Sequence, residues 1–269
     1  MDSLYKICEL DDWIGFLIFW EEFLWIFALG KFFNNRFLFE SMEENKEISK
    51  IQDLAKKYHL DLENLKKEQI MLAKGLEIKD KIDFNLADTF GAIDNTFFGN
   101  NLLSCIVVCN KDMEVIDQAY VFERVKFPYI PGFRNYRELP AIMDTYEKLN
   151  EKPDIIFVPA NGITNSRLGL ASHLGLALGV PTIGISNSII DCDIKSDTIY
   201  KSGKKVGRVL LSREGSNPLY ISPGNLISVD TAYDVCKLLV RLPHKRPEPL
   251  HLVAKYTKEV RKELNPKFV

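Results

Sequence analysis

Cysteine is scarce in this sequence, and its spacing excludes the common cysteine-based sites. The 269 residues contain five Cys, and none of them forms a C-x-x-C pair. The four histidines do not cluster with cysteine, so the sequence predicts no zinc site. Cys105 and Cys109 fall on one face of an apolar, strand-like run, which predicts buried thiols in the reducing environment of the cytoplasm.

An excess of charge of one sign is also missing. Lys and Arg total 35 and Asp and Glu total 37, which gives a formal net charge of −2. Any nucleic-acid surface must therefore be a local patch. With 46% hydrophobic and 27% charged residues, the composition excludes a disordered, collagen-like or disulfide-stapled chain.

Long uninterrupted hydrophobic runs are absent as well. The longest apolar run, residues 13–29, is interrupted at its centre by Glu21 and Glu22, whereas a membrane-spanning helix needs about 20 apolar residues. The start Met1-Asp2-Ser3 lacks the basic residues of a secretory signal. An interfacial helix stays open as an alternative, although the usual basic face is missing. We expect no stable membrane insertion.

The aromatic residues are unevenly distributed. The first 41 residues hold all three Trp and 8 of the 17 Phe, and without them the chain carries 32 basic and 30 acidic residues. The segment Met42-Glu-Glu-Asn-Lys-Glu is typical of a cytosolic start. We expect residues 1–41 to be an apolar extension, either a mis-assigned start or dispensable, and residues 42–269 to form one monomeric, cytoplasmic domain.

The order of predicted elements indicates an α/β fold. Helical periodicity covers residues 46–74, and three strand-like runs at 90–97, 102–108 and 116–122 predict an antiparallel meander. The remaining predicted helices are 136–149, 167–178, 229–239 and 251–264, and the remaining strands are 155–158, 181–185, 206–211 and 219–221. Unbroken apolar strands between helices predict a mixed sheet with helices on both faces.

Three motifs resemble those of the endonuclease V family and occur in the same order. Residues 129–138, Y-I-P-G-F-R-N-Y-R-E, are similar to its YxPG…RE motif. Residues 167–185 (R-L-G-L-A-S-H-L-G, then V-P-T-I-G-I) and 218–224 (P-L-Y-I-S-P-G) match two further motifs. The resemblance implies a ribonuclease-H-like mixed sheet with flanking helices. It also implies a Mg²⁺- or Mn²⁺-dependent nuclease that cleaves on the 3′ side of deaminated adenine (inosine, hypoxanthine) in DNA or RNA.

The resemblance implies six polar catalytic positions, of which two keep the family residue. Asp94 and Glu138 are retained and are the expected metal ligands. A family Asp, His, Lys and second His are replaced, respectively, by Pro159, Asn165, Asn187 and Asn225. Proline has no ligating side chain, and asparagine neither carries charge nor transfers protons at neutral pH. These substitutions predict weak or absent cleavage.

The expected nucleic-acid-binding features are better preserved. By resemblance, Tyr129, Ile130 and Pro131 form a wedge that separates stacked bases at the lesion. Glycines that permit close approach to a flipped base are Gly132, Gly162 and Gly184. Each of these glycines is equally consistent with an ordinary turn. His173 is expected to pack or hydrogen-bond rather than catalyse.

A basic segment between residues 195 and 213 is the candidate phosphate contact. Its central residues are Lys204, Lys205 and Arg208, and a solvated hairpin explains them equally well. Three acids nearby, Asp191, Asp193 and Asp197, are expected in a solvated loop. Two hypotheses follow: a weakened nuclease of repair acting on inosine, or a non-catalytic module that binds nucleic acid or another partner.

Overall fold

The computed structural model describes residues 48–264, and the chain divides into two compact units, Met1–Leu60 and Asp61–Val269. The extension expected over residues 1–41 lies outside the described residues. In the first unit, a helix covers residues 48–57, and His59 then adopts the left-handed conformation (φ 54°). The prediction of one helix over 46–74 was wrong, because Asp61 caps a second helix, α2 (Leu62–Ala73), by accepting a hydrogen bond from the Asn64 amide.

The predicted meander is confirmed. Strands β1 (Thr89–Phe98), β2 (Asn101–Asn110) and β3 (Val115–Arg124) pair antiparallel in order. Gly99 supplies the positive φ (57°) of the first turn. The chain continues through α3 (Arg134–Glu147), β4 (Ile155–Val158), α4 (Leu170–Leu178) and β5 (Thr182–Ser186), as the alternation of helices and buried strands predicts.

All described strands of the second unit join one mixed sheet of order β3-β2-β1-β4-β5-β9-β8-β7-β6. Strand β4 pairs parallel with β1 and β5, and β9 (Leu219–Asn225) and β8 (Lys204–Leu210) continue the sheet antiparallel. The prediction of a solvated loop around Asp191, Asp193 and Asp197 was wrong in part. Residues on either side of Asp197 form the hairpin β6 (Asp193–Lys195) and β7 (Thr198–Lys201), because Ile199 is buried there.

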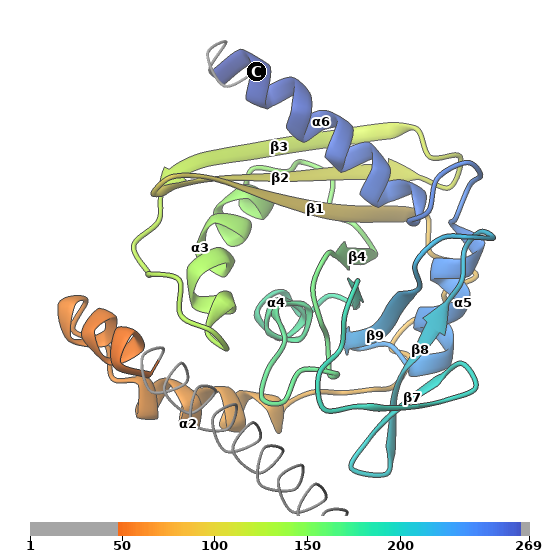
Figure 1. Cartoon of the computed structure of the whole chain (residues 1–269). Helices are drawn as coiled ribbons and strands as arrows, with labels where there is room; N and C mark the ends of the chain where they lie inside the picture. Colours follow the sequence, from red (N-terminus) through yellow and green to blue (C-terminus); the bar gives the residue numbers. More distant parts are fainter. Residues whose placement is uncertain (1–47, 265–269) are drawn as a thin grey trace, which may run out of the picture. The chain divides into compact units, whose positions relative to one another are not determined.

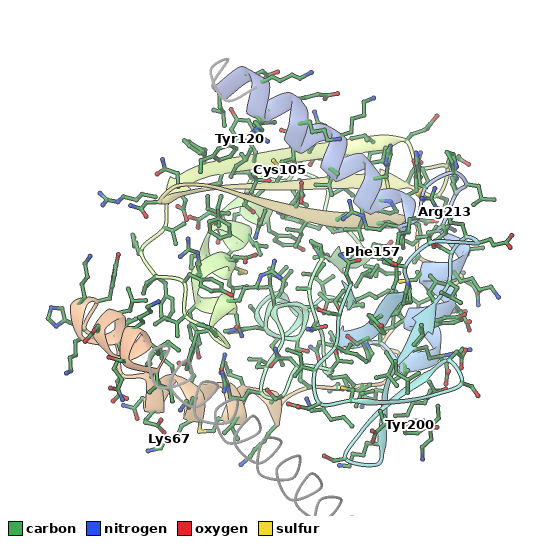
Figure 2. The ribbon with its side chains drawn as sticks, in the orientation of Figure 1. Lys67, Cys105, Tyr120, Phe157, Tyr200 and Arg213 are labelled. Atoms are coloured by element: carbon green, nitrogen blue, oxygen red, sulfur yellow. The ribbon has the colours of Figure 1, made fainter. Side chains whose placement is uncertain are left out.

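Helices cover both faces of the sheet (Figure 1). Helices α5 (Val229–Leu238) and α6 (Glu248–Leu264) pack with Ala92, Cys105 and Phe157, whereas α3 and α4 pack with Ile93 on the opposite face. Figure 2 shows Cys105 and Phe157 in the interior. Side chains alternate between faces along a strand, so Asp94 lies on the same face as Ala92, and Asn95 lies on the α3 face.

Three of the four cysteines in the described part of the chain behave as buried apolar residues, and Cys192 is half-buried. Cys105, Cys109 and Cys236 are buried free thiols, and burial raises the pKa of Cys105 and Cys109 to about 12. Such thiols stay protonated and unreactive at neutral pH. Within residues 48–264, none of the helices combines the length and apolar character that crossing a bilayer requires.

Candidate functional site

A pocket of about 210 Å³ joins the first motif to the loop that follows β4. Tyr129, Ile130 and Pro131 line it from the segment before α3, and Asn161 and Asn165 line it from the loop. Ile130 is 2% exposed and anchors the segment, whereas Tyr129 is 66% exposed at the mouth. The structure therefore brings together the expected wedge and the expected glycine loop.

Two of the predicted glycines are required by close backbone packing. A Cβ on Gly162 would collide with the carbonyl of Pro223 in β9, and one on Gly184 would lie 2.5 Å from the Gly162 nitrogen. The Gly162 N–H donates to the Ser222 hydroxyl at 2.9 Å. The loop after β4 thus rests directly on β5 and β9, which fixes one wall of the pocket.

At Gly132, a positive φ and a neighbouring side chain require glycine. Its φ is 81°, and the Arg167 side chain occupies the space where a Cβ would lie. Its carbonyl accepts hydrogen bonds from Gln69 Nε2 (3.0 Å) and Arg167 Nη2 (2.9 Å), and Arg167 Nε donates to Gln69 Oε1. Gln69, fully buried, was not predicted as a site residue, because its partners lie far away in sequence.

Asn135 forms the buried floor of the pocket. It is 3% exposed, and its Nδ2 donates to the Leu168 carbonyl and lies 3.2 Å from His173 Nδ1. An amide donor facing this nitrogen requires the neutral imidazole with Nδ1 as acceptor. His173 therefore positions Asn135 by hydrogen bonding, as the sequence indicated.

Lowering the pH is expected to destabilise the fold through His173. Burial lowers the pKa of His173 from its ordinary value of 6.5, and the Glu68 carboxylate opposes this shift. The unfolded chain then binds the proton more readily, so stability is complete above pH 6.5 and falls below it, by at most about 1.4 kcal/mol per pH unit. Chemical denaturation over this range should show a shallower decline for His173→Gln, and an unchanged slope would contradict the assignment.

The retained carboxylates Asp94 and Glu138 have different partners. Glu138 is 3% exposed, and Arg134 binds both of its oxygens, at 2.5 Å through Nε and 3.0 Å through Nη2. Asn95 Nδ2 donates to Oε2 of the same carboxylate at 2.9 Å. Asp94 is half-buried and has neither an ion pair nor a hydrogen bond within the described range. The two acids therefore have different surroundings, and the negative charge of Glu138 is compensated by Arg134.

Two of the three asparagines that replace family residues form hydrogen bonds within the fold. Asn165 Oδ1 accepts from the Arg167 backbone N–H, as in a local turn. Asn225 is 4% exposed, and its amide accepts from Glu77 N–H and donates to the Gly175 carbonyl. Asn187 is exposed and lines another cavity, together with residues 243–246 and His251. Pro159 directly follows β4.

The basic candidates differ in how far their charge is compensated. Lys205 Nζ lies 2.6 Å from Asp230, and Arg208 binds Asp197 and stacks over Tyr233 at 3.8 Å. Lys204 is exposed and has no ion pair among residues 48–264. Most of the positive charge of this group is therefore offset by neighbouring acids.

Comparison with known proteins decides the family. The endonuclease V family model matches residues 70–255. The chain belongs to the endonuclease V family. Endonuclease V of Thermosipho melanesiensis is 35% identical over 207 residues, covering 73% of this chain and 90% of the relative. Endonuclease V of Archaeoglobus fulgidus is 30% identical over 214 residues, covering 77% and 96%.

Solved structures of the family confirm the ribonuclease-H-like fold. Bacillus subtilis endonuclease V superposes with a TM-score of 0.71 at 26% identity, covering 76% of this chain and 93% of that one. Endonuclease V of Ciona intestinalis, in complex with DNA containing an inosine, superposes with a TM-score of 0.66 at 20% identity, covering 76% and 98%. The predicted α/β class is thus confirmed.

The endonuclease V family is metal-dependent, generally on Mg²⁺, but the expected ligands of this chain do not fit such a site. Pro159 offers no oxygen ligand from its side chain, and the Glu138 oxygens are bound by Arg134 and Asn95. Mg²⁺ needs several oxygen ligands in octahedral geometry. The one group of three metal-binding side chains in the described part of the chain lies elsewhere and contains neither Asp94 nor Glu138.

Proposed function

We propose that this protein recognises deaminated adenine in DNA or RNA and cleaves the backbone weakly or not at all. The observation that supports this most strongly is the contrast within one site. The wedge and the glycine loop form a pocket, whereas the retained carboxylate Glu138 is paired with Arg134 and the family Asp is replaced by Pro159. Binding and cleavage rely on these different groups, so one can persist without the other.

The pocket has the features that base recognition requires. Tyr129 presents an exposed aromatic ring at the mouth, and stacking of a base on an aromatic side chain contributes about 1–3 kcal/mol. Asn161 and Asn165 provide polar groups at the wall. The inosine-containing DNA bound by the Ciona relative supports this choice of ligand. Gly132, Gly162 and Gly184 shape the pocket, and we propose Ile130 and Pro131 as the rest of the wedge.

We also propose that Lys204, Lys205 and Arg208 contact the phosphate backbone. Lys204 is the main contributor in this proposal, because its charge is not offset by an acid in the described structure. Lys205 and Arg208 share Asp230 as a partner and would exchange that ion pair for phosphate. A weak dependence of binding on salt concentration would then follow from few phosphate contacts.

Catalysis is impaired in this proposal because the lost Asp, Lys and two His are replaced by the uncharged Pro159, Asn187, Asn165 and Asn225. Asp94 remains as an unpaired acid, but Asn165, Asn187 and Asn225 cannot act as general acid, general base or cation. Restoring Pro159→Asp alone is therefore not expected to restore cleavage. If any Mg²⁺ or Mn²⁺ binds at this position, Asp94 and Glu138 would be its ligands.

Tyr129→Ala is expected to weaken binding to inosine-containing oligonucleotides by about 10-fold or more, because a stacking contact is lost. Fluorescence anisotropy with matched inosine and adenosine strands, DNA and RNA, measures this change. Tyr58→Ala, at a second exposed tyrosine outside the pocket, is the control and should bind as wild type. Equal affinity of the wild type for inosine and adenosine strands would exclude lesion recognition and leave an interaction module.

A further inference from the structure

Two of the four histidines meet a glutamate at the start of α6. His244 lies in the link after α5, Glu248 is the first residue of α6, and His251 follows one turn later. Glu248 and His251, three residues apart on α6, share one face of the helix, and the link before α6 brings His244 to the same place, where its Nδ1 contacts Glu248. The sequence holds no cluster of Cys with His, but histidines together with a carboxylate can also bind zinc.

The three side chains are close enough to share an ion. One ligand atom from each lies within 4.8 Å of the other two. His244 Nδ1 lies 2.7 Å from Glu248 Oε2, and the imidazole rings of His244 and His251 stack with centroids 3.5 Å apart. Zinc bonds of about 2.0–2.1 Å hold tetrahedral ligands about 3.4 Å apart. The two stacked imidazoles must separate and rotate for their in-plane nitrogens to converge with the Glu248 carboxylate on one ion.

The surrounding backbone holds this group in place. Glu248 N–H donates to the Leu239 carbonyl, and His244 N–H donates to the Arg241 carbonyl. Arg213 Nη1 donates to the Pro243 carbonyl, and Figure 2 shows Arg213 beside the start of α6. The Glu248 side chain is 12% exposed and that of His244 is 32% exposed. A partly buried, fixed ligand set loses little conformational entropy when it binds an ion.

The cluster opens onto a cavity of about 390 Å³, which His244 and His251 line with Asn187, Lys245 and Arg246. A metal bound by three protein ligands keeps a fourth position for water or an anionic oxygen. The two basic side chains would favour an anion in that position, and their repulsion of the metal ion itself is opposed by the Glu248 carboxylate. This arrangement differs from the carboxylate-rich set that Mg²⁺ prefers.

We propose that His244, Glu248 and His251 form a binding site for a divalent transition metal of the zinc class, with its open coordination position facing this cavity. Two imidazoles and one carboxylate are a ligand set that zinc uses with an open fourth position. The group contains neither Asp94 nor Glu138, and the proposal does not depend on the proposed recognition of inosine.

A purely structural role for the His244–Glu248 hydrogen bond makes a different prediction. That pair ties the link before α6 to the first residue of the helix without any third group, so His251 would then be irrelevant to metal binding. In the metal site, His251 supplies one of three ligands. The variant His251→Gln therefore separates the two explanations while it leaves the hydrogen-bonded pair intact.

The test uses the full, tag-free chain stripped of metal with EDTA. Titration with Co²⁺, followed by its visible spectrum, should show one ion per chain without a thiolate charge-transfer band, and Zn²⁺ but not Mg²⁺ should displace it. His251→Gln should weaken binding by about 100-fold or more, since loss even of a supporting group costs about 10–100-fold. His59→Asn, at an exposed histidine, is the matched control.

Folding of each variant is checked by circular dichroism, and Glu248→Gln serves as a second ligand variant if His251→Gln does not fold. Zn²⁺ should raise the midpoint of thermal unfolding of the wild type and of His59→Asn but not of the ligand variants. Absence of Co²⁺ and Zn²⁺ binding to the wild type would overturn the proposal. Equal affinity in wild type and ligand variants would overturn it as well.

Discussion

Gly162→Ala is expected to lower the free energy of unfolding by about 3 kcal/mol or more. An added Cβ would collide with the Pro223 carbonyl and reach the Ser222 hydroxyl at 3.0 Å. The obstacle is mainly the backbone of β9, which cannot rotate away as a flexible side chain could, and overpacking of this kind typically costs about 1–3 kcal/mol and sometimes more. Urea unfolding followed by circular dichroism measures the change.

Gly75→Ala is the matched control for this substitution. Its added Cβ would meet only ordinary contacts, 3.4 Å from the Leu72 carbonyl oxygen and 3.6 Å from Leu176 Cδ2. Its effect should stay within about 0.5 kcal/mol, as for most surface substitutions. If Gly162→Ala were as stable as this control, the loop after β4 would not rest on β9 and the described pocket wall would be wrong.

Asn225→Leu is expected to destabilise the protein by about 2–4 kcal/mol. The amide of Asn225 accepts from Glu77 N–H at 2.9 Å and donates to the Gly175 carbonyl at 3.1 Å, and the side chain is nearly fully buried. Leucine would leave Glu77 N–H without this partner, at a cost of about 1–3 kcal/mol, and the Gly175 carbonyl, which keeps its hydrogen bond from Gly179 N–H, would lose a further bond contributing about 0.5–1.5 kcal/mol. Thermal and chemical unfolding both report the loss.

Asn187→Leu, at a second position where the family has a charged residue, separates this structural role from a catalytic one. Asn187 is exposed, so the same change there should alter stability by no more than about 0.5 kcal/mol. An equally small effect of Asn225→Leu would show that its two hydrogen bonds contribute nothing to the fold. Asn225 would then be free to serve the reaction instead.

The sequence predicts the elements well where the pattern is local. The three strands of the meander are long, apolar and separated by turn residues, and they occur where expected. The family motifs predict the wedge and the glycine loop as separate candidates, and the structure shows that they line one pocket. The break between the two N-terminal helices was missed, because the apolar periodicity continues through His59 and Asp61.

The parts that could not be predicted depend on contacts between distant residues. The Asn225–Glu77 hydrogen bond spans 148 residues, and the contact between Glu138 and Asn95 spans 43. From the sequence alone, Glu138 is simply a retained catalytic acid, whereas in the structure it is a buried ion-paired group. The pair Arg134–Glu138 could have been suspected, since residues four apart face each other on a helix.

Cleavage in a single turnover tests the central claim most directly. With protein in excess over an inosine-containing oligonucleotide, and with Mg²⁺ or Mn²⁺ present, binding and strand breakage are measured on the same sample. We expect the protein to bind the inosine strand in preference to the adenosine strand and to leave it intact. Metal-dependent breakage on the 3′ side of the inosine, abolished by Asp94→Ala, would contradict this claim and show that this chain is a working nuclease.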